Sequence, residues 1–465
     1  MNGAVRASAA TRASRRSSLY TLLVAAMVAL PPLSIDMVLP ALPSIASSLR
    51  APVGTAGLAI SLFLAGFALS QLVLGPLSDR LGRRPVLLAS CAGFSLAGIG
   101  AAFAGSIAGL LALRLVQGIG AGGCMVVIFA VVRDLFEGDE VRSRLAAANA
   151  IMGIAPMVAP TVGALFLAFT GWRGLFAFLG AGGAALLLGC GFRLGESIGE
   201  NRRRVGAGEL AAGYLKVLSV RSVLGCALIA GLSFGLLQAY VVGSSFLFLG
   251  VLHVRPRVYA LIFATIASGQ IWGATGAAAL ARRGVRHQTV LLGGILLGLA
   301  GSGALLLLAT LGLVRVATAI PTLLLVTTAL GLITPTAAHG VLAPMPQVAG
   351  TASAALGFVR MSGGALASAL VSLSSAGSPF AIAVVMALFA SGALAVWLAA
   401  VAPPRRPHSA ASMNATPEIV ETLCDTPEKK ARPAAGGGAS TVFGPDGAPP
   451  CTPTPPTRRG SPARA

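Results

Sequence analysis

Long apolar stretches alternate with short polar or basic connections from about residue 19 to residue 401. A helix needs about 20 residues to cross a hydrocarbon core of ~30 Å. In the first half, stretches of this kind run approximately over Leu19 to Leu39, Thr55 to Leu77, Pro85 to Phe103, Ile107 to Val132, Leu145 to Ala168 and Gly174 to Leu194. In the second half they run over Ser222 to Leu249, Val258 to Leu280, Thr289 to Thr310, Val316 to Ala338, Ala349 to Ser374 and Pro379 to Val401. The pattern predicts an all-α membrane protein with twelve transmembrane helices in two six-helix bundles.

The order of the spans predicts five segments. We expect a cytoplasmic N-terminus over residues 1–18, an N-terminal six-helix bundle over 19–194, a cytoplasmic linker over 195–221, a C-terminal six-helix bundle over 222–401 and a cytoplasmic tail over 402–465. The tail is rich in Pro, Gly, Ala and Thr, and such a composition cannot bury a core. We therefore predict that the tail is disordered.

Composition and charge agree with a membrane protein. Only 10% of the residues are charged and 55% are hydrophobic, whereas soluble domains average about 25% charged residues. The net charge of +20 could indicate a nucleic-acid partner, but no aromatic pattern accompanies the basic residues. With both termini in the cytoplasm, 27 Lys and Arg lie on the cytoplasmic side and 5 on the opposite side. The positive-inside rule favours this orientation, with the lipid bilayer as partner and no nucleic acid.

Acidic residues are almost absent from the predicted spans. Asp36 lies well inside the first apolar stretch, and no Asp or Glu occurs from Leu210 to Pro417. A carboxylate inside a span costs about 2.5 to 3.5 kcal/mol on insertion scales, so it is typical of a functional site. Asp36 lies near the outer end of the span, where solvation is the alternative explanation. Flanking prolines can loosen the helix beside a cavity, and we predict that Asp36 carries the coupled proton.

The connection Gly75 to Pro85, "GPLSDRLGRRP", is the strongest local motif. A basic loop that satisfies the positive-inside rule is the simpler explanation. The motif nevertheless resembles the cytoplasmic signature of the major facilitator superfamily. The segments "SIDMVLPALPSIA", "RLVQGIGAGGCMVVIFAVVRDLF" and "GIAPMVAPTVGALF" resemble one branch of it, the Bcr/CflA-type drug:proton antiporters, which include bicyclomycin and chloramphenicol resistance transporters.

This resemblance implies alternating access between two states, with the loop as a conformational latch. The latch residues would be Gly75, Asp79, Arg80, Gly82, Arg83 and Asp134. Asp79 would face the start of the eleventh span near Ala349, and Arg83 would pair with Asp134. The resemblance also implies an antiporter motif at Gly153, Pro156, Pro160 and Gly163.

Two arginines lie inside predicted spans. Arg114 needs a partner as a permanent cation, and the resemblance links it to proton transfer. A structural tie to backbone carbonyls is the alternative. Arg360 either is solvated at the cytoplasmic mouth or faces the cavity, which would then be net positive and favour neutral or acidic compounds.

Other polar side chains on the spans are candidates for lining a substrate cavity, although each alone is also explained by helix packing. They are Gln71, Gln117, Asn149, Gln238, Tyr240 and Gln270.

The function that follows is proton-coupled export of small drug-like molecules across the bacterial inner membrane, with chloramphenicol, bicyclomycin or sulfonamide types as candidate substrates. A metabolite exporter or a proton symporter of the same fold is the alternative. We expect no enzyme activity, no catalytic or metal-binding residues and no cofactor, because the proton gradient supplies the energy. We also expect the protein to work as a monomer.

Overall fold

The computed structural model describes residues 20–197, 207–374 and 378–402 of the chain. The first span covers Tyr20–Ser48 and consists of a helix over residues 20–36, a turn, the short 3-10 helix η1 (Leu39–Ala41) and α2 (Leu42–Ser48). The remaining helices of the first half are α3 (Val53–Leu81), α4 (Arg83–Ala102), α5 (Ile107–Leu135) and α6 (Gly138–Arg193). The long helices of the second half are α8 (Arg221–Ser245), α9 (Pro256–Arg282), α10 (His287–Thr310), α11 (Val316–Leu342), α12 (Ala349–Leu373) and α13 (Pro379–Val396). Three short elements adjoin them: the π-helical turn η2 (Phe246–Val251) follows α8, the 3-10 turn η3 (Pro346–Val348) precedes α12, and η4 (Trp397–Val401) follows α13.

Eleven helices in the described part of the chain are long and apolar enough to cross a membrane. One of them, α6, is 56 residues long and is interrupted at Gly171, whose φ of 68° and ψ of −177° are not helical. Glycine reaches positive φ without a steric penalty, so Gly171 divides α6 into two spans. The described residues therefore contain the twelve spans that the apolar pattern predicted, in an all-helical fold.

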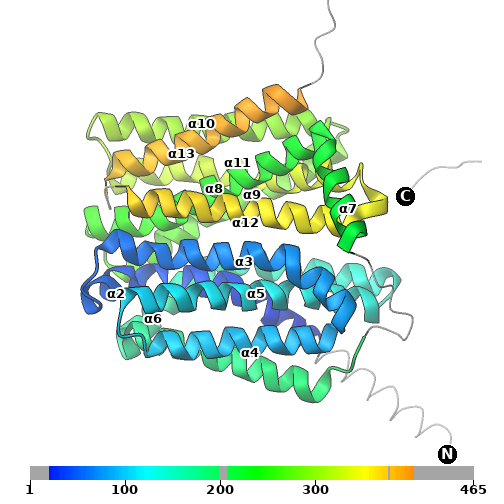
Figure 1. Cartoon of the computed structure of the whole chain (residues 1–465). Helices are drawn as coiled ribbons and strands as arrows, with labels where there is room; N and C mark the ends of the chain where they lie inside the picture. Colours follow the sequence, from blue (N-terminus) through cyan, green and yellow to red (C-terminus); the bar gives the residue numbers. More distant parts are fainter. Residues whose placement is uncertain (1–19, 198–206, 375–377, 403–465) are drawn as a thin grey trace, which may run out of the picture. The chain divides into compact units, whose positions relative to one another are not determined.

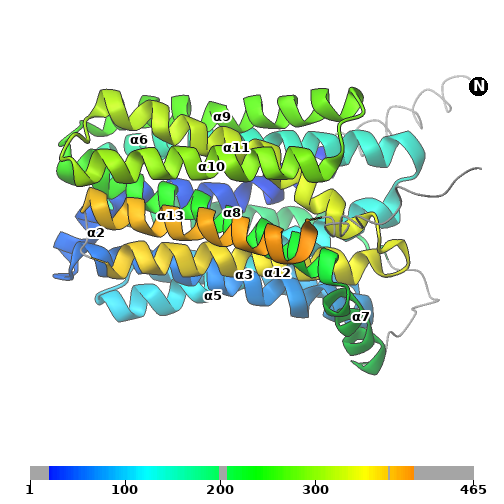
Figure 2. The same ribbon diagram turned by 90° about the horizontal axis from the view of Figure 1, so that it is seen from above.

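Each half packs mainly on itself. In the first half α5 packs against α3 and α4, and α4 packs against α6; in the second half α8 contacts α11, α12 and α13. The halves meet where α3 lies beside α12 and where α6 lies beside α9 (Figures 1 and 2). A hydrogen bond of 2.9 Å from Ser61 Oγ to Ser368 Oγ joins α3 to α12.

Close helix packing depends on small residues at the crossings. A Cβ added to Gly118 on α5 would overlap the backbone carbonyl of Phe63 on α3. Small residues allow this backbone approach, which membrane helices use because lipid supplies no hydrophobic force between them.

The predicted linker contains a helix, α7 (Ala207–Ser219), which packs against α12. Its Val217 is buried, and Tyr214 Oη donates a hydrogen bond of 3.4 Å to the carbonyl of Leu72 on α3. The predicted N-terminus over residues 1–18 and the tail from residue 403 lie outside the described residues.

Candidate functional site

The first span breaks immediately after Asp36. Residues 20–36 are helical, residues 37 and 38 form a turn, and η1 follows. Pro40 and Pro43 have no N–H to continue a helical hydrogen-bond ladder, which places the break before them. Pro31 and Pro32 lie inside the helix, so only the later pair of prolines has the loosening effect expected from the sequence.

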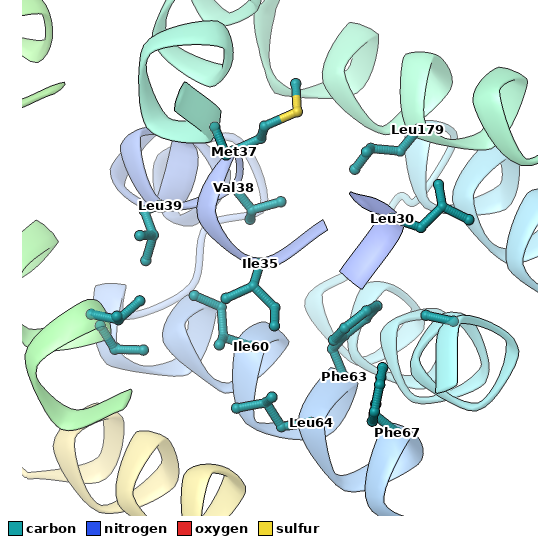
Figure 3. Close-up of a cluster of buried hydrophobic side chains, with 14 of the residues drawn as sticks. Leu30, Ile35, Met37, Val38, Leu39, Ile60, Phe63, Leu64, Phe67 and Leu179 are labelled. Carbon is teal, nitrogen blue, oxygen red and sulfur yellow. The ribbon is translucent and has the colours of Figure 1, made fainter. Parts of the chain in front are cut away.

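Asp36 is buried in this break, with 5% of its surface exposed. Figure 3 shows the apolar environment of the segment: Ile35 faces Ile60, Phe63 and Leu64 of α3, whereas Met37 points to the opposite side. Within the described ranges, the carboxylate has no hydrogen bond or ion pair. In this conformation Asp36 is therefore not a residue solvated at the outer surface.

Arg114 on α5 ties three helices together. Its Nη2 donates to the carbonyl of Ser34 at 2.9 Å, and its Nε donates to the carbonyl of Ala59 on α3 at 3.1 Å. Its Nη1 donates to Gln117 Oε1 at 2.8 Å, and the guanidinium lies 4.4 Å from the centre of the Phe63 ring. The last carbonyls of a helix have no intrahelical partner, so the break after Asp36 leaves the Ser34 carbonyl able to accept. The sequence left open whether Arg114 serves proton transfer or a structural tie to backbone carbonyls. In this conformation Arg114 bonds backbone carbonyls.

A serine and two tyrosines of the second half belong to the surroundings of the same break. Ser245 Oγ on α8 donates a hydrogen bond of 2.8 Å to the carbonyl of Leu39. Asp36 lies within electrostatic range of both Tyr240 on α8 and Tyr259 on α9. The distribution of acidic residues in the sequence indicated only the first half, and it did not reveal that Ser245, Tyr240 and Tyr259 of the second half belong to the site.

The two tyrosines differ in their hydrogen bonding. Tyr259 Oη pairs with Ser244 Oγ at 3.0 Å. The ring of Tyr240 stacks on Phe263 with centroids 5.6 Å apart, and its buried hydroxyl has no partner in the described part of the chain. Tyr240 thus offers a buried hydroxyl that is unused among the described residues.

The predicted latch is only partly formed. Arg83 Nε donates to Asp134 Oδ2 at 3.0 Å, which confirms the pair that the motif implied. Asp79 forms an ion pair with Arg83 one turn further on. Among the described residues, Asp79 makes no hydrogen bond to the start of α12 near Ala349, so its position facing that helix end in the latched form stays a prediction.

The other predicted latch residues, Gly75, Arg80 and Gly82, lie at the end of α3 and in the reversal that follows it. Gly82 adopts a φ of 110° at the reversal between α3 and α4. Gly75 lies beside Val126 of α5, and Arg80 is exposed in the last turn of α3.

Glu196 joins this network and was missed by sequence reasoning. Its carboxylate accepts hydrogen bonds from the backbone N–H groups of Arg83 at 2.9 Å and Arg84 at 3.3 Å. An acid in this position stabilises a helix N-terminus by satisfying its unpaired donors. The following residue, Ser197, donates to Asp134 Oδ2 at 3.2 Å. The one signal in the sequence was an acid just after the sixth span.

Of the four residues of the antiporter motif, Gly163 lies against the break after Asp36, whereas Gly153 at the other end of the motif is exposed. A Cβ added to Gly163 would overlap the carbonyl of Met37, so α6 packs directly on the turn after Asp36. Pro160 is buried and Pro156 is half-buried, whereas Gly153 is exposed and has open space around its Cα. Gly163 is therefore the residue of the motif that shapes the site.

The candidate cavity residues fall into two places. Gln117 and Tyr240 lie with Arg114 and Asp36, as described above. Gln71 on α3 and Gln238 on α8 are buried and lie against α12, and Arg360 on α12 is half-buried with its guanidinium 5.2 Å from the centre of the Phe234 ring. Gln270 is half-buried on α9, and the side chain of Asn149 lies outside the described residues.

The fold consists of two bundles of spans joined in parallel order, with a buried ionisable residue at a helix break. This arrangement is typical of a secondary membrane transporter. The Major Facilitator Superfamily model matches residues 24–368, and the chain belongs to that family. It is a multi-pass membrane transporter for small molecules, and it is not an enzyme.

Several relatives carry names connected with drug resistance. The chain is 32% identical to the Uncharacterized MFS-type transporter YdgK of Bacillus subtilis (strain 168) over 361 residues, which cover 76% of this chain and 88% of YdgK. It is 40% identical over 151 residues to a Chloramphenicol resistance protein of Pseudomonas aeruginosa, which covers 32% of this chain and 36% of that protein. It is 39% identical over 163 residues to Multidrug resistance protein MdtL of Escherichia coli O45:K1, which covers 35% of this chain and 42% of MdtL.

Solved structures share the fold at low identity. The xylose transporter XylE from E. coli, in a partially occluded inward open conformation, superimposes with a TM-score of 0.66 at 14% identity over 83% of this chain and 98% of that chain. A bacterial homologue of the human lysosomal transporter Spinster, in an inward-facing and occupied conformation, gives a TM-score of 0.64 at 15% identity over 83% of this chain and 96% of that chain.

Proposed function

We propose that this transporter exports small drug-like molecules across the bacterial inner membrane in exchange for protons, as a member of the Bcr/CflA-type branch. Both termini lie in the cytoplasm, the protein works as a monomer, and the proton gradient drives it without a cofactor. Chloramphenicol, bicyclomycin and sulfonamides are the first substrates to test, since relatives that match about two fifths of their length are named for chloramphenicol or multidrug resistance.

The observation that carries the proposal is the buried carboxylate of Asp36 at the break of the first span, which has no partner among the described residues. An ionised carboxylate without a counter-ion is expensive in an apolar environment, and binding a proton removes that cost. When the halves move apart on one side, water reaches Asp36 and the proton can exchange. Substrate binding and proton binding then compete through the same break.

The remaining residues have supporting roles in this cycle. Arg114 positions the last turn before Asp36 through its bond to Ser34. The loop network of Arg83, Asp134 and Asp79 biases the equilibrium between the two states, and it can contribute only a few kcal/mol because it must change in every cycle.

The test is transport by purified protein in proteoliposomes with an imposed pH gradient. Wild type should move at least one of the three candidate drugs only when the gradient is present, and Asp36→Asn should abolish this uphill transport. Gradient-independent movement of the drugs, or co-transport of drug with protons in the same direction, would favour a facilitator or a symporter instead.

A further inference from the structure

Arg360 is a cation in the middle of a span, and no counter-ion for it occurs among the described residues. It is the twelfth of the 25 residues of α12, and the Phe234 ring that it faces belongs to the fourteenth of the 25 residues of α8. At 1.5 Å per residue, Arg360 lies roughly 16 Å from the start of its helix. That depth is too great for snorkelling to the helix end, so the explanation of a solvated residue at the cytoplasmic mouth does not fit.

The helix geometry gives the direction of the side chain. On α12, Gly357 faces α3, since a Cβ there would lie 2.7 Å from Gln71 Oε1. Gly363 faces α8, since a Cβ there would overlap the carbonyl of Gly231. Successive helical residues are about 100° apart, so Arg360 lies about 60° from each of these glycines, between them. It therefore points between α3 of the first half and α8 of the second half, and not toward lipid.

Two buried amides flank Arg360 on the same side of α12. Gln71 contacts Gly357, three residues before Arg360, and Gln238 contacts Gly364, four residues after it. Gln238 is only 3% exposed, and its Nε2 has no hydrogen-bond partner in the described part of the chain. A buried amide donor without a partner is costly, which is the expected state of a group that awaits a ligand.

Within the described part of the chain, no acidic side chain neutralises Arg360 in this conformation. No Asp or Glu occurs between Leu210 and Pro417, and Arg360 has no hydrogen bond or ion pair among the described residues. Its one contact with an aromatic ring, that of Phe234, is a weak cation–π interaction. Asp79 and Asp134 are engaged with Arg83, and Asp36 makes no ion pair within residues 20–197, 207–374 and 378–402.

We infer that Gln71, Gln238 and Arg360 form an anion-accepting subsite that binds the carboxylate of an organic anion carried by the transporter. The guanidinium fork matches a carboxylate in shape and charge, and the Gln238 amide supplies an additional donor. Phe234 offers an aromatic surface for the rest of the molecule. The inference rests on the proposed transport function but not on proton coupling. It adds organic carboxylates to the candidate substrates, since chloramphenicol and bicyclomycin carry no carboxylate.

The experiment compares carboxylates with their uncharged amides. Purified full-length protein in nanodiscs is heated in the presence of benzoate or salicylate, and separately of benzamide or salicylamide, at constant chloride. A ligand that binds only the folded state raises the unfolding midpoint. We expect the carboxylates to bind wild type at least tenfold more tightly than their amides.

Three variants separate the subsite from general charge effects. Arg360→Gln should lose at least fivefold in carboxylate affinity and should treat carboxylate and amide alike. Arg360→Lys should keep a smaller preference, and it serves as the readout if Arg360→Gln does not fold. Arg257→Gln removes one exposed cation from the first turn of α9 and should behave as wild type.

Several outcomes would overturn the inference. The first is equal binding of carboxylates and amides by wild type, and the second is an unchanged preference in both Arg360 variants. The third is a rise of the unfolding midpoint with added sodium chloride as large as the rise with benzoate, which would indicate a site for an inorganic anion. Asp36→Asn should keep the preference for carboxylates, so a failure of proton coupling would be visible separately from a failure of this subsite.

Discussion

Arg114 Nη2 donates a hydrogen bond of 2.9 Å to the carbonyl of Ser34, two residues before the carboxylate that we propose to carry the proton. The cation thus contacts the backbone of the first span near Asp36. This bond fixes the last helical turn before the break, and the break itself packs against α3 and α6. Movement of the first span would therefore change the burial of Asp36.

The first prediction concerns Arg114. Replacement by Met should destabilise the protein, because the carbonyls of Ser34 and Ala59 lose their donor and each unsatisfied buried group costs about 1–3 kcal/mol. Arg114→Lys should recover part of the loss. Thermal unfolding in nanodiscs measures the effect, with Arg257→Gln as the exposed control. Equal midpoints for Arg114→Met and the control would show that the tie does not support the fold.

The second prediction compares two glycines of α6. Gly163→Ala should lower both thermal stability and transport, since the added methyl group would overlap the carbonyl of Met37 beside the break. Overpacking of this kind costs about 1–3 kcal/mol. Gly153→Ala is the matched control because a Cβ there meets no atom within 4 Å. The explanation fails if both substitutions have the same effect.

The third prediction compares two tyrosines. Tyr259→Phe removes the hydrogen bond to Ser244 and should cost about 1 kcal/mol of stability. Tyr240→Phe removes a hydroxyl that has no partner among the described residues, so stability should be kept or slightly raised. A stability loss in Tyr240→Phe as large as in Tyr259→Phe would mean that the hydroxyl has a partner in the membrane.

The fourth prediction concerns the loop network. Arg83→Gln and Asp134→Asn each break the 3.0 Å pair, and the double variant should be little worse than either single one. Transport should slow while substrate affinity stays close to wild type, because the pair lies far from the Asp36 break. Initial rates and equilibrium binding measure the two quantities separately. Additive losses in the double variant would exclude a direct coupling of the two residues.

Local sequence features predicted the parts of this structure that depend on one segment at a time. Hydropathy and length gave the spans, and Pro40 and Pro43 indicated a break near Asp36. The Arg83–Asp134 pair came from the resemblance of the loop motif. Neither Glu196 at the start of α4 nor Ser244 beside Tyr259 could be predicted in this way, because each role arises only when distant helices pack together. For Arg114 the sequence established the need for a partner but could not choose between a carboxylate and backbone carbonyls.

The central claim is that Asp36 carries the exchanged proton. Its most direct test is the proton release caused by substrate, measured with a pH-sensitive dye on detergent-purified wild type and Asp36→Asn, with binding of the same drug followed in parallel. Wild type should release protons when the drug binds, and Asp36→Asn should release none although the variant is folded and still binds drug. Unchanged proton release from Asp36→Asn would contradict this claim.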